Sequence, residues 1–414
     1  MPLPDFLWGV STSAFQIEGA FTEDGRAPSV WDEFPSIEGH TAEIACDHRH
    51  RYAEDVALMR DLGVDAYRFS VSWPRVEGTG LDFYDRLVDE LLAADIRPVV
   101  TLYHWDTPRH VEDAGGWLNR DTASRFADYA AAVAARLVDR VAMWIPLNEP
   151  AMTTLLGYAI GQHAPGKALL YDALPTAHHL NLAHGLAVRA LRAAGAAAVG
   201  TANNHTPVWP ASPSDDDRAA AAAYSALHNW LYADPVLAGR YPEELADRLP
   251  VRDGDLATIA QPLDFYGVNY YNPTRLRAPS EGNPLPFELV DIAEHPKTGY
   301  GWPVVPSGLE EIVAELRRRH PALPPVHITE NGCSYPHEIA DTARIAYLDA
   351  HVEAALRAGA SGYFVWSLLD NFEWDSGYTQ RFGLVHVDYE TQRRTPRDSF
   401  RWYRDRIRRD RTGR

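Results

Sequence analysis

Two glutamates, Glu149 and Glu330, each follow a run of apolar residues, in the segments WIPLNEP at 144–150 and HITENG at 327–332. Two carboxyl groups held at the ends of two strands can cleave a glycosidic bond. One protonates the leaving oxygen, while the other attacks the sugar or activates a water molecule. A glutamate at a strand end is also common as a solvated or salt-bridged surface residue, so the residues around the pair must decide between the two interpretations.

Eight short apolar or β-branched runs along the chain are candidates for the strands that position these glutamates. They are residues 5–11, 65–71, 97–104, 141–149, 197–204, 263–271, 324–331 and 361–369. Segments of helical periodicity lie between them, and several end in glycine, as helix C-termini often do. The alternation predicts repeated strand and crossover-helix units, and eight such units close into a (β/α)8 TIM barrel. We expect residues 1–414 to form one catalytic domain of this kind.

The strand ends carry groups suited to sugar recognition. Active sites of such barrels lie at the C-terminal ends of the strands, so these side chains are expected to meet in one pocket. Amide, imidazole and carboxylate groups form paired hydrogen bonds with hydroxyls, and an aromatic face packs on the C–H surface of a sugar ring. The strand-end residues are Gln16, Glu18, Arg68, His104, Trp105, Asn148, Glu149, Asn269, Tyr270, Tyr271, Glu330, Asn331, Trp366, Asp370, Asn371, Glu373 and Trp374.

Composition narrows the classes of partner. The chain has 414 residues and a formal net charge of −18, which argues against nucleic acid or an anionic membrane surface as a partner. The arginine-rich end, from residue 401 to 414, is interpreted as a last helix with a basic tail. We find no signal peptide and no run of the roughly 18 apolar residues that a membrane span needs. With only Cys46 and Cys333 present, no disulfide framework is indicated, and a reduced cytoplasmic location is expected.

The histidine clusters at 48–50 and 178–179 superficially suggest metal ligands, but neither belongs to a spaced Cys/His set. We therefore expect no metal and no cofactor. Trp8, Trp31 and Trp144 are interpreted as core or barrel packing.

The ordered motifs closely resemble family 1 of the glycoside hydrolases, the retaining β-glucosidases and their relatives. FLWGVSTSAFQIEGA resembles the N-terminal signature of the family. The other motifs follow in order along nearly the whole chain: a long match ending in DAYRFSVSWPR, then TLYHWDTP, LNEP, GVNYY, ITENG, WSLLDNFEW and RFGLVHVDY. The resemblance implies an exo-acting retaining β-glycosidase, most simply a β-glucosidase. Its substrate would be a small β-glycoside or cello-oligosaccharide. The sugar preference, the aglycone, the balance of hydrolysis and transglycosylation, and the oligomeric state stay open.

The resemblance also implies a role for each position. Glu149 would be the general acid/base and Glu330 the nucleophile, with Arg68, Asn269 and Tyr271 positioning the two carboxylates. The terminal sugar would contact Gln16, His104, Asn148, Tyr271, Trp366, Glu373 and Trp374, with Trp366 as its platform. Phe382 would close the far wall, and Trp302 would line the entrance on the leaving-group side.

Elementary chemistry agrees with the two catalytic roles. A nucleophile must be ionised, which the charge of Arg68 and a hydrogen bond from Tyr271 would favour. A general acid must keep its proton near neutral pH, which requires desolvation and a nearby negative charge. In the retaining arrangement the carboxyl groups of Glu149 and Glu330 should lie about 5 to 5.5 Å apart. We expect Glu373 to be ionised and to accept hydrogen bonds from the sugar.

Some features depart from the usual family pattern. Pro146 stands where the family commonly has threonine, and a proline inside a strand removes a ladder donor and can bend the backbone before the acid. The segment VEGTGLDFYDR and the region 32–46 are shorter than usual. These are rim loops, so the departures concern the leaving-group side.

Three alternatives remain at this point. A catalytically inactive sugar-binding protein on the same barrel and a relative that uses a substrate-borne group in place of the acid are both disfavoured, because both glutamates are present. A 6-phospho-β-glycosidase would need cations or hydroxyl donors near the sugar O6, where this chain has Glu373 and Trp374, and a carboxylate would repel a phosphate.

Overall fold

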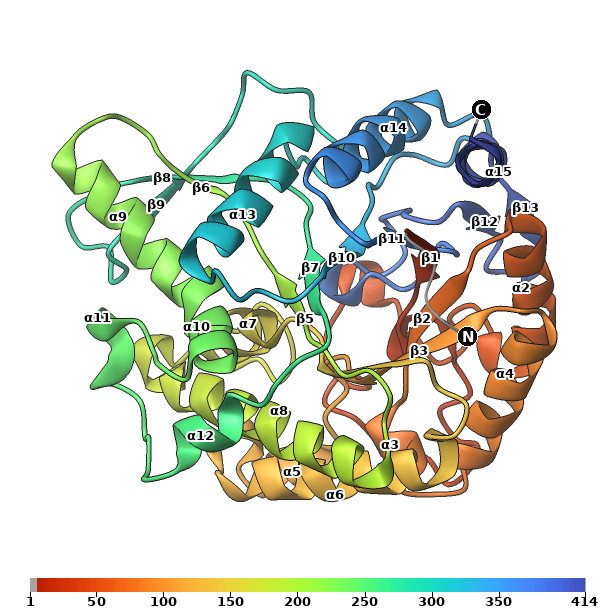
Figure 1. Cartoon of the computed structure of the whole chain (residues 1–414), viewed down its shortest axis with the longest axis horizontal. Coiled ribbons are helices and arrows are strands. Elements are labelled where there is room, and N and C mark those ends of the chain that lie inside the picture. The colour runs from red at the N-terminus through yellow and green to blue at the C-terminus, as the bar shows by residue number, and fades with distance from the viewer. Residues whose placement is uncertain (1–5, 414) are drawn as a thin grey trace.

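The structure, a computed structural model that describes residues 6–413, has a barrel of parallel strands at its centre (Figure 1). The barrel strands are β1 (Leu7–Ser11), β2 (Ala66–Ser70), β3 (Arg97–Tyr103), β4 (Met143–Leu147), β5 (Ala202–Asn204), β7 (Tyr266–Asn269), β10 (Val326–Asn331) and β11 (Gly362–Trp366). Their order is β4-β3-β2-β1-β11-β10-β7-β5. Parallel bridges from Trp144 to Val199 and from Asn148 to Ala202 join the two edges. The predicted (β/α)8 barrel is therefore confirmed, although position 5 of the first run lies outside the described residues.

The strands form where the sequence is apolar for several consecutive positions, because both faces of a parallel barrel sheet are buried. All residues of β1, β2, β4, β7, β10 and β11 are buried. Pro146 does not interrupt β4: the register with β3 pairs Thr101 with Ile145 and Tyr103 with Leu147, and only the pair at Pro146 is missing. The pairing of β3 with β4 therefore continues on both sides of Pro146, although proline has no N–H to donate.

Helices surround the barrel, as the helical periodicity predicts (Figure 1). The long ones are α2 (His48–Leu62), α4 (Leu81–Ala93), α6 (Asp121–Leu137), α8 (Leu174–Ala194), α13 (Pro306–Arg319), α14 (Thr342–Arg357) and α15 (Asp398–Thr412). α2 and α8 end at Gly63 and Gly195, which adopt left-handed φ angles of 77° and 99°. Glycine accepts that conformation without a Cβ clash, which explains the helix ends expected from the sequence.

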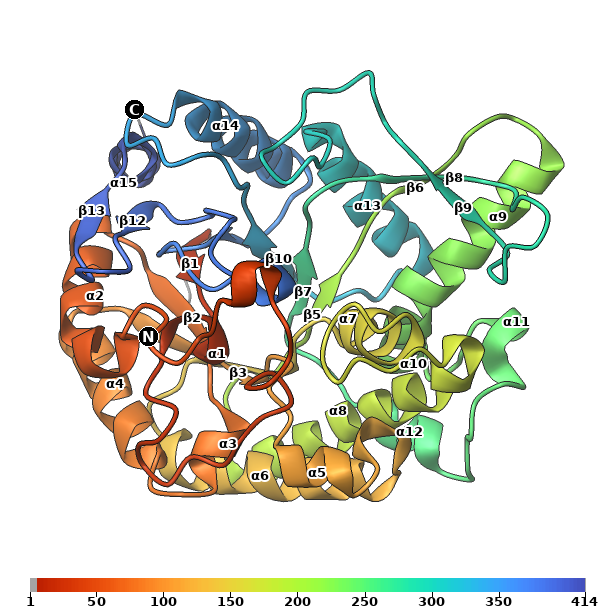
Figure 2. The ribbon, with the colours of Figure 1, turned by 180° about the vertical axis from the view of Figure 1, so that it is seen from behind.

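Further elements lie outside the strand and helix repeats. β6 (Val208–Pro210), β8 (Thr274–Arg277) and β9 (Glu288–Val290) form a small sheet, and β12 (Val385–Val387) pairs with β13 (Arg394–Pro396). Shorter helical segments are α1 (Ala14–Ile17), η1 (Ile37–Gly39), α3 (Trp73–Val76), α5 (Arg109–Asp113), η2 (Gly116–Leu118), α7 (Pro150–Met152), η3 (Thr153–Ala159), η4 (Leu170–Ala173), α9 (Asp215–Ser225), η5 (Ala226–Trp230), α10 (Leu231–Ala238), α11 (Glu243–Ala246), α12 (Asp255–Ile259) and η6 (Trp374–Ser376). Figure 2 shows the face on which α1 and α7, which follow β1 and β4, lie in front of the barrel.

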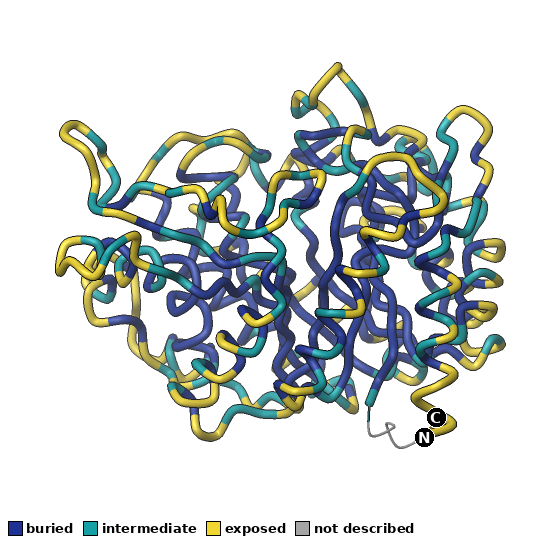
Figure 3. The backbone as a smooth tube through the Cα atoms, turned by 90° about the horizontal axis from the view of Figure 1, so that it is seen from above, coloured by how far each residue is buried: buried dark blue, intermediate teal, exposed yellow. Residues whose placement is uncertain are grey.

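The core fills the barrel and the space between its strands and helices (Figure 3). Trp8 and Trp144 belong to this core, and Trp31 packs in a smaller cluster with Phe15 and Trp374. The interpretation of these three tryptophans as packing residues is therefore confirmed.

The histidine clusters have structural partners. His48 pairs with the buried carboxyl of Asp55, while His178 bonds to Tyr241 and Asp255. Within residues 6–413, no group of three His, Cys, Asp or Glu side chains is arranged to hold a metal ion. No helix in the same range is both long enough and apolar enough to cross a membrane.

Candidate active site

A cavity of about 280 Å3 lies at the C-terminal ends of the barrel strands. Both glutamates singled out from the sequence line it. Its lining comprises His104, Trp105, Glu149, Met152, Leu156, Gln162, His163, Asn204, Tyr271, Tyr300, Trp302, Glu330, Trp366, Glu373, Trp374, Asp375 and Phe382. Nine of the predicted site residues are in this set, and they come from segments far apart in the sequence. The barrel thus gathers eight of the seventeen strand-end side chains into one pocket.

Glu330, near the end of β10, is held by two donors. Arg68 Nη1 on β2 donates to its Oε1 at 2.5 Å, and the Tyr271 hydroxyl donates to its Oε2 at 2.8 Å. Burial raises the pKa of Glu330 above its usual value, and the charge of Arg68 together with these hydrogen bonds offsets part of that rise. The close approach of β11 to this end of β10 needs Gly332, since a Cβ there would meet the Trp366 carbonyl oxygen at 1.7 Å.

Glu149 lies where the chain leaves β4. Its φ of 44° is a left-handed conformation that few non-glycine residues adopt, and such conformations often occur at functional sites. Asn269 Nδ2 donates to its Oε1 at 2.7 Å, and Asn204 Nδ2 reaches the same oxygen at 3.3 Å. Because Oε1 accepts two hydrogen bonds, the proton of the neutral acid belongs on Oε2. Burial and the negative charge of Glu330 raise the pKa of Glu149 to about 8.

The two carboxyls therefore have opposed environments. The Arg68 guanidinium lies beside Glu330. Glu149 instead accepts hydrogen bonds from amides, and the negative charge of Glu330 disfavours its ionisation. At neutral pH this arrangement favours a proton on Glu149 and a negative charge on Glu330. An acid and a nucleophile are the two groups that a retaining glycosidase needs.

Asn148 fixes the tautomer of His104. The Asn148 Oδ1 atom accepts hydrogen bonds from Arg68 Nη2 at 2.6 Å and from Asn269 Nδ2 at 3.0 Å, so the amide nitrogen must face His104 Nε2, 3.1 Å away. That nitrogen then acts as acceptor, and the imidazole carries its proton on Nδ1. Burial, with the charge of Arg68, lowers the pKa of His104 well below its ordinary value, so the ring is neutral. Its buried Nδ1 has no protein partner and can donate to a sugar hydroxyl.

Glu373 differs from the sequence-based expectation. Gln16 Nε2 donates to its Oε2 at 3.2 Å, but burial and the charges of Asp375 and Glu330 raise the pKa of Glu373 to about 8. The expectation of an ionised Glu373 at neutral pH is therefore wrong for the unliganded site. Three carboxyl groups share one small cavity, and each disfavours ionisation of the others. A neutral Glu373 can donate one hydrogen bond and accept others.

Aromatic rings form two walls of the cavity. The ring of His104 is stacked against Trp366 and Trp374, with centroid distances of 5.7 and 5.8 Å. On another wall, Trp302 stacks on Tyr300 at 4.4 Å and also contacts Phe382. The residues predicted as platform, far wall and entrance all line the cavity.

Four predicted residues support the lining without belonging to it. Arg68, Asn148 and Asn269 form the hydrogen-bonded layer behind Glu149, Glu330 and His104. Gln16 is fully buried, and its amide bonds to Asn371 and Glu373.

Five other strand-end residues face different partners, contrary to the expectation that all would meet in one pocket. Glu18 pairs with Arg75, Asp370 pairs with Arg381 and Arg397, and the Tyr270 hydroxyl donates to the Val305 carbonyl. Asn331 and Asn371 donate to Tyr270 and Ser367.

Several lining residues were missed by sequence reasoning. Asn204 ends the predicted run 197–204, so the rule about strand ends could have found it. A chain of hydrogen bonds orients the Asn204 amide. The Tyr224 hydroxyl lies 3.3 Å from His228 Nδ1, and His228 Nε2 lies 2.9 Å from Asn204 Oδ1. His163 and Tyr300 lie in loops and Asp375 lies in the three-residue helical segment η6, where no periodic pattern indicates the cavity.

Comparisons with known proteins show the family and the fold of the chain. The sequence model of glycosyl hydrolase family 1 matches residues 2–412. The thermostable beta-glucosidase B of Thermobispora bispora is 48% identical over 442 residues, covering 99% of this chain and 91% of that protein. A bifunctional beta-D-glucosidase/beta-D-fucosidase of Bifidobacterium breve is 42% identical, covering 96% of each protein. The crystal structure of a psychrophilic beta-glucosidase from Micrococcus antarcticus superposes with a TM-score of 0.93 at 42% identity, covering 98% of this chain and 97% of that one.

Proposed function

The chain belongs to glycosyl hydrolase family 1, and from this premise we propose that it is an exo-acting β-glucosidase that releases terminal, nonreducing β-D-glucosyl residues with retention of configuration. The observation that carries the proposal is the pair of buried carboxyls, Glu149 and Glu330, which line one cavity in opposed electrostatic environments. We propose residues 1–414 as a single catalytic domain.

In the first step, the ionised carboxylate of Glu330 attacks C1 of the sugar from the face opposite the leaving group. The bond between C1 and the glycosidic oxygen breaks, and the proton on Glu149 Oε2 passes to that oxygen. The products are a free alcohol and a glycosyl ester of Glu330. Tyr271 and Arg68, which bond to Glu330, hold the attacking carboxylate in place.

In the second step, Glu149 acts as a base. The ester has removed the negative charge of Glu330, which is one cause of the raised pKa of Glu149, so the deprotonated form becomes more stable. Glu149 takes a proton from water, the water oxygen attacks C1, and the ester bond breaks. Two inversions give net retention.

Retention has a direct test. Proton NMR of the early reaction should detect the β-anomer of the released sugar before mutarotation mixes the two anomers. Initial appearance of the α-anomer would instead require an inverting site with the carboxyls about 6.5 to 9.5 Å apart.

Specificity for an unphosphorylated sugar is supported by the charge of the lining. Of the described residues that line the cavity, none is lysine or arginine, and Glu373 and Asp375 are both present. The cavity therefore offers no cation to a phosphate at O6, and the charge of Asp375, which also raises the pKa of Glu373, would repel the phosphate. Initial rates on aryl β-glucosides with and without a 6-phosphate should favour the unphosphorylated substrate, and the reverse preference would identify a 6-phospho-β-glycosidase.

We predict that Glu373→Ala lowers kcat/KM for β-glucosides by about 5- to 150-fold, equivalent to about 1 to 3 kcal/mol, because two hydrogen bonds of about 0.5 to 1.5 kcal/mol each are lost. A β-fucoside, which lacks the O6 hydroxyl, should lose less. Initial rates on the two aryl glycosides, compared before and after the substitution, measure this difference. Equal losses on both would exclude Glu373 from O6 recognition.

Asn204 is proposed as a positioning residue for the acid. Its amide stabilises the ionised form of Glu149, so Asn204→Ala should raise the pKa of Glu149. The alkaline limb of the kcat/KM profile, which marks deprotonation of the acid, should then move to higher pH by about half to one unit, as expected for one hydrogen bond.

The control for this experiment is Thr206→Ser, which keeps a hydroxyl that donates to the Asn272 carbonyl. Its alkaline limb should coincide with that of the unaltered protein. An unmoved limb in Asn204→Ala would mean that the amide only packs against the site.

The proposed route uses two carboxyls and water, so we propose neither a metal nor a cofactor.

Cys46 and Cys333 are both free and buried thiols, which supports the cytoplasmic location that we propose.

A further inference from the structure

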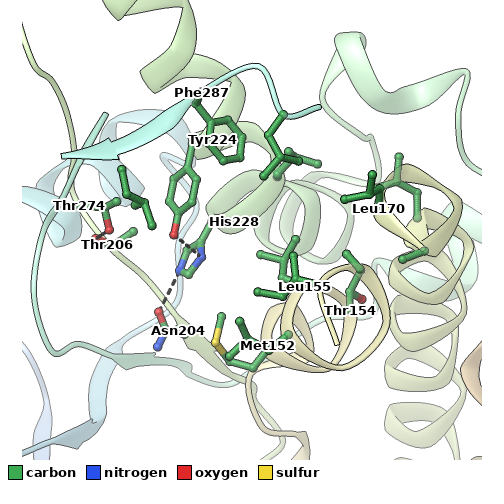
Figure 4. A pocket seen from close by; sticks show the side chains of 18 of the residues that line it. Met152, Thr154, Leu155, Leu170, Asn204, Thr206, Tyr224, His228, Thr274 and Phe287 are labelled. Atoms are coloured by element: carbon green, nitrogen blue, oxygen red, sulfur yellow. Dashed lines mark hydrogen bonds between the residues drawn. The ribbon is translucent and has the colours of Figure 1, made fainter. Parts of the chain in front are cut away.

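Figure 4 shows a second cavity, of about 400 Å3. This cavity and the catalytic cavity share Met152, Leu156, Asn204, Tyr271 and Trp302 as lining residues. We call this second cavity the side chamber. Because Asn204 bonds to Glu149, the group that protonates the leaving oxygen, the side chamber lies on the side of the site from which the leaving group departs.

Most of the side chamber is apolar. The described residues that line it and carry aliphatic side chains are Met152, Leu155, Leu156, Ala159, Ile160, Leu170, Ala173, Leu174, Leu227, Leu285 and Leu289, and Phe287 adds an aromatic ring. Most of them come from η3, η4, η5 and the segment around β9, which lie outside the strand and helix repeats of the barrel, while Met152 ends α7 and Leu174 begins α8.

The rim of the chamber exposes large apolar side chains to solvent. Leu289 is 71% exposed, the highest value for a large apolar side chain among residues 6–413, and Ile160 and Leu170 are 48% and 39% exposed. Apolar side chains gathered beside a cavity are typical of a binding surface for an apolar ligand.

Several polar groups of the chamber already have protein partners. The Tyr224 hydroxyl, His228 and Asn204 form the chain of hydrogen bonds that Figure 4 shows. Thr206 Oγ1 donates to the Asn272 carbonyl, and Thr154 Oγ1 accepts from Thr176. A second sugar unit would bring several hydroxyls to a surface with few free partners, and unpaired buried hydroxyls oppose binding.

We propose that the side chamber holds the leaving group, and that the preferred substrates are β-D-glucosides of apolar alcohols or phenols rather than cello-oligosaccharides. This inference rests on the proposed function and specifies its substrate class. The apolar part of the alcohol lies against Leu155 and Leu156, while its glycosidic oxygen stays beside Glu149.

The test compares methyl, butyl and hexyl β-D-glucoside with cellobiose on the unaltered protein. The three alkanols are similarly poor leaving groups, so differences in kcat/KM report binding of the alkyl chain and not its need for protonation. We expect kcat/KM to rise about two- to fourfold per buried methylene, so that hexyl glucoside exceeds methyl glucoside by about 30-fold or more. Cellobiose should fall below hexyl glucoside.

A variant localises the effect. Leu155→Asn places a polar amide in the apolar wall and should lower kcat/KM for hexyl glucoside by about tenfold, while methyl glucoside is unaffected. The matched control is Leu92→Asn in α4, an exposed leucine outside both cavities, which should leave the whole series unchanged.

The outcomes separate this inference from the proposed function. A flat alkyl series, or cellobiose as the better substrate, would overturn the apolar leaving-group site while β-glucosidase activity stands. Absence of hydrolysis for every β-glucoside, activated aryl glucosides included, would overturn the proposed function itself.

Discussion

Glu330→Gly should lose β-glucoside hydrolysis by several orders of magnitude, because no carboxylate remains to form the glycosyl ester. Added azide or formate should restore turnover of an aryl β-glucoside with an activated leaving group, since a small anion fits the space of the missing carboxylate. The anion attacks C1 from the face that Glu330 used, so the glycosyl azide formed should have the α configuration. Release of the phenol and NMR of the azide measure both effects.

The control is Glu338→Gly, which removes an exposed glutamate a few residues further along the chain. It should keep normal activity and show no response to azide. A β-configured azide from the Glu330 variant would assign the nucleophile to another residue.

Glu149→Ala should reduce activity by an amount that depends on the leaving group. General acid catalysis typically contributes about 10²- to 10⁴-fold, and a poor leaving group such as an alkanol needs all of it. An aryl glycoside with an acidic phenol needs little protonation, so its first step should be nearly unaffected. Rates of ester formation for the two substrate types, measured in single-turnover experiments, test this difference.

The same substitution should change the pH profile. Burial and the charge of Glu330 raise the pKa of Glu149 to about 8, so the unaltered protein should lose kcat/KM as pH rises through about 8 and the acid gives up its proton. The variant has no such proton to lose, and its alkaline limb should disappear. If the limb persists, Glu373, whose pKa is also raised to about 8, becomes the group that titrates.

A suitable control is Glu112→Ala. Glu112 is a partly buried carboxyl with a raised pKa, but it lies outside the catalytic cavity. Its removal should leave both the leaving-group dependence and the alkaline limb intact. Equal losses on both substrate types in the Glu149 variant would contradict an acid/base role.

The barrel could be predicted from the sequence because its strands are buried on both faces. Burial on both faces requires continuous apolar runs, and each of the eight predicted runs contains one barrel strand of the described chain. The small sheet of β6, β8 and β9 was not predicted. Its strands have three or four residues with intermediate or mixed burial, so they leave no clear period in the sequence.

Strand ends identified both glutamates and about half of the cavity lining, but the rule has limits. Asp370 ends a strand region as Glu149 does, yet Arg381 and Arg397 neutralise it inside the protein. Tyr300 and Asp375 line the cavity from outside the strands. Which strand-end side chains reach the cavity depends on partners that lie far away in the sequence.

The sequence by itself determined the family, the order of the barrel strands and the two carboxyls, because these depend on residue types in consecutive positions. Only the tertiary structure decided which groups carry protons. The raised pKa values of Glu149 and Glu373 come from burial and from charges contributed by other segments, which no local pattern contains. The side chamber likewise exists only because η3, η5 and the segment around β9 meet in space, and this contact of distant segments sets the surface against which the leaving group would lie.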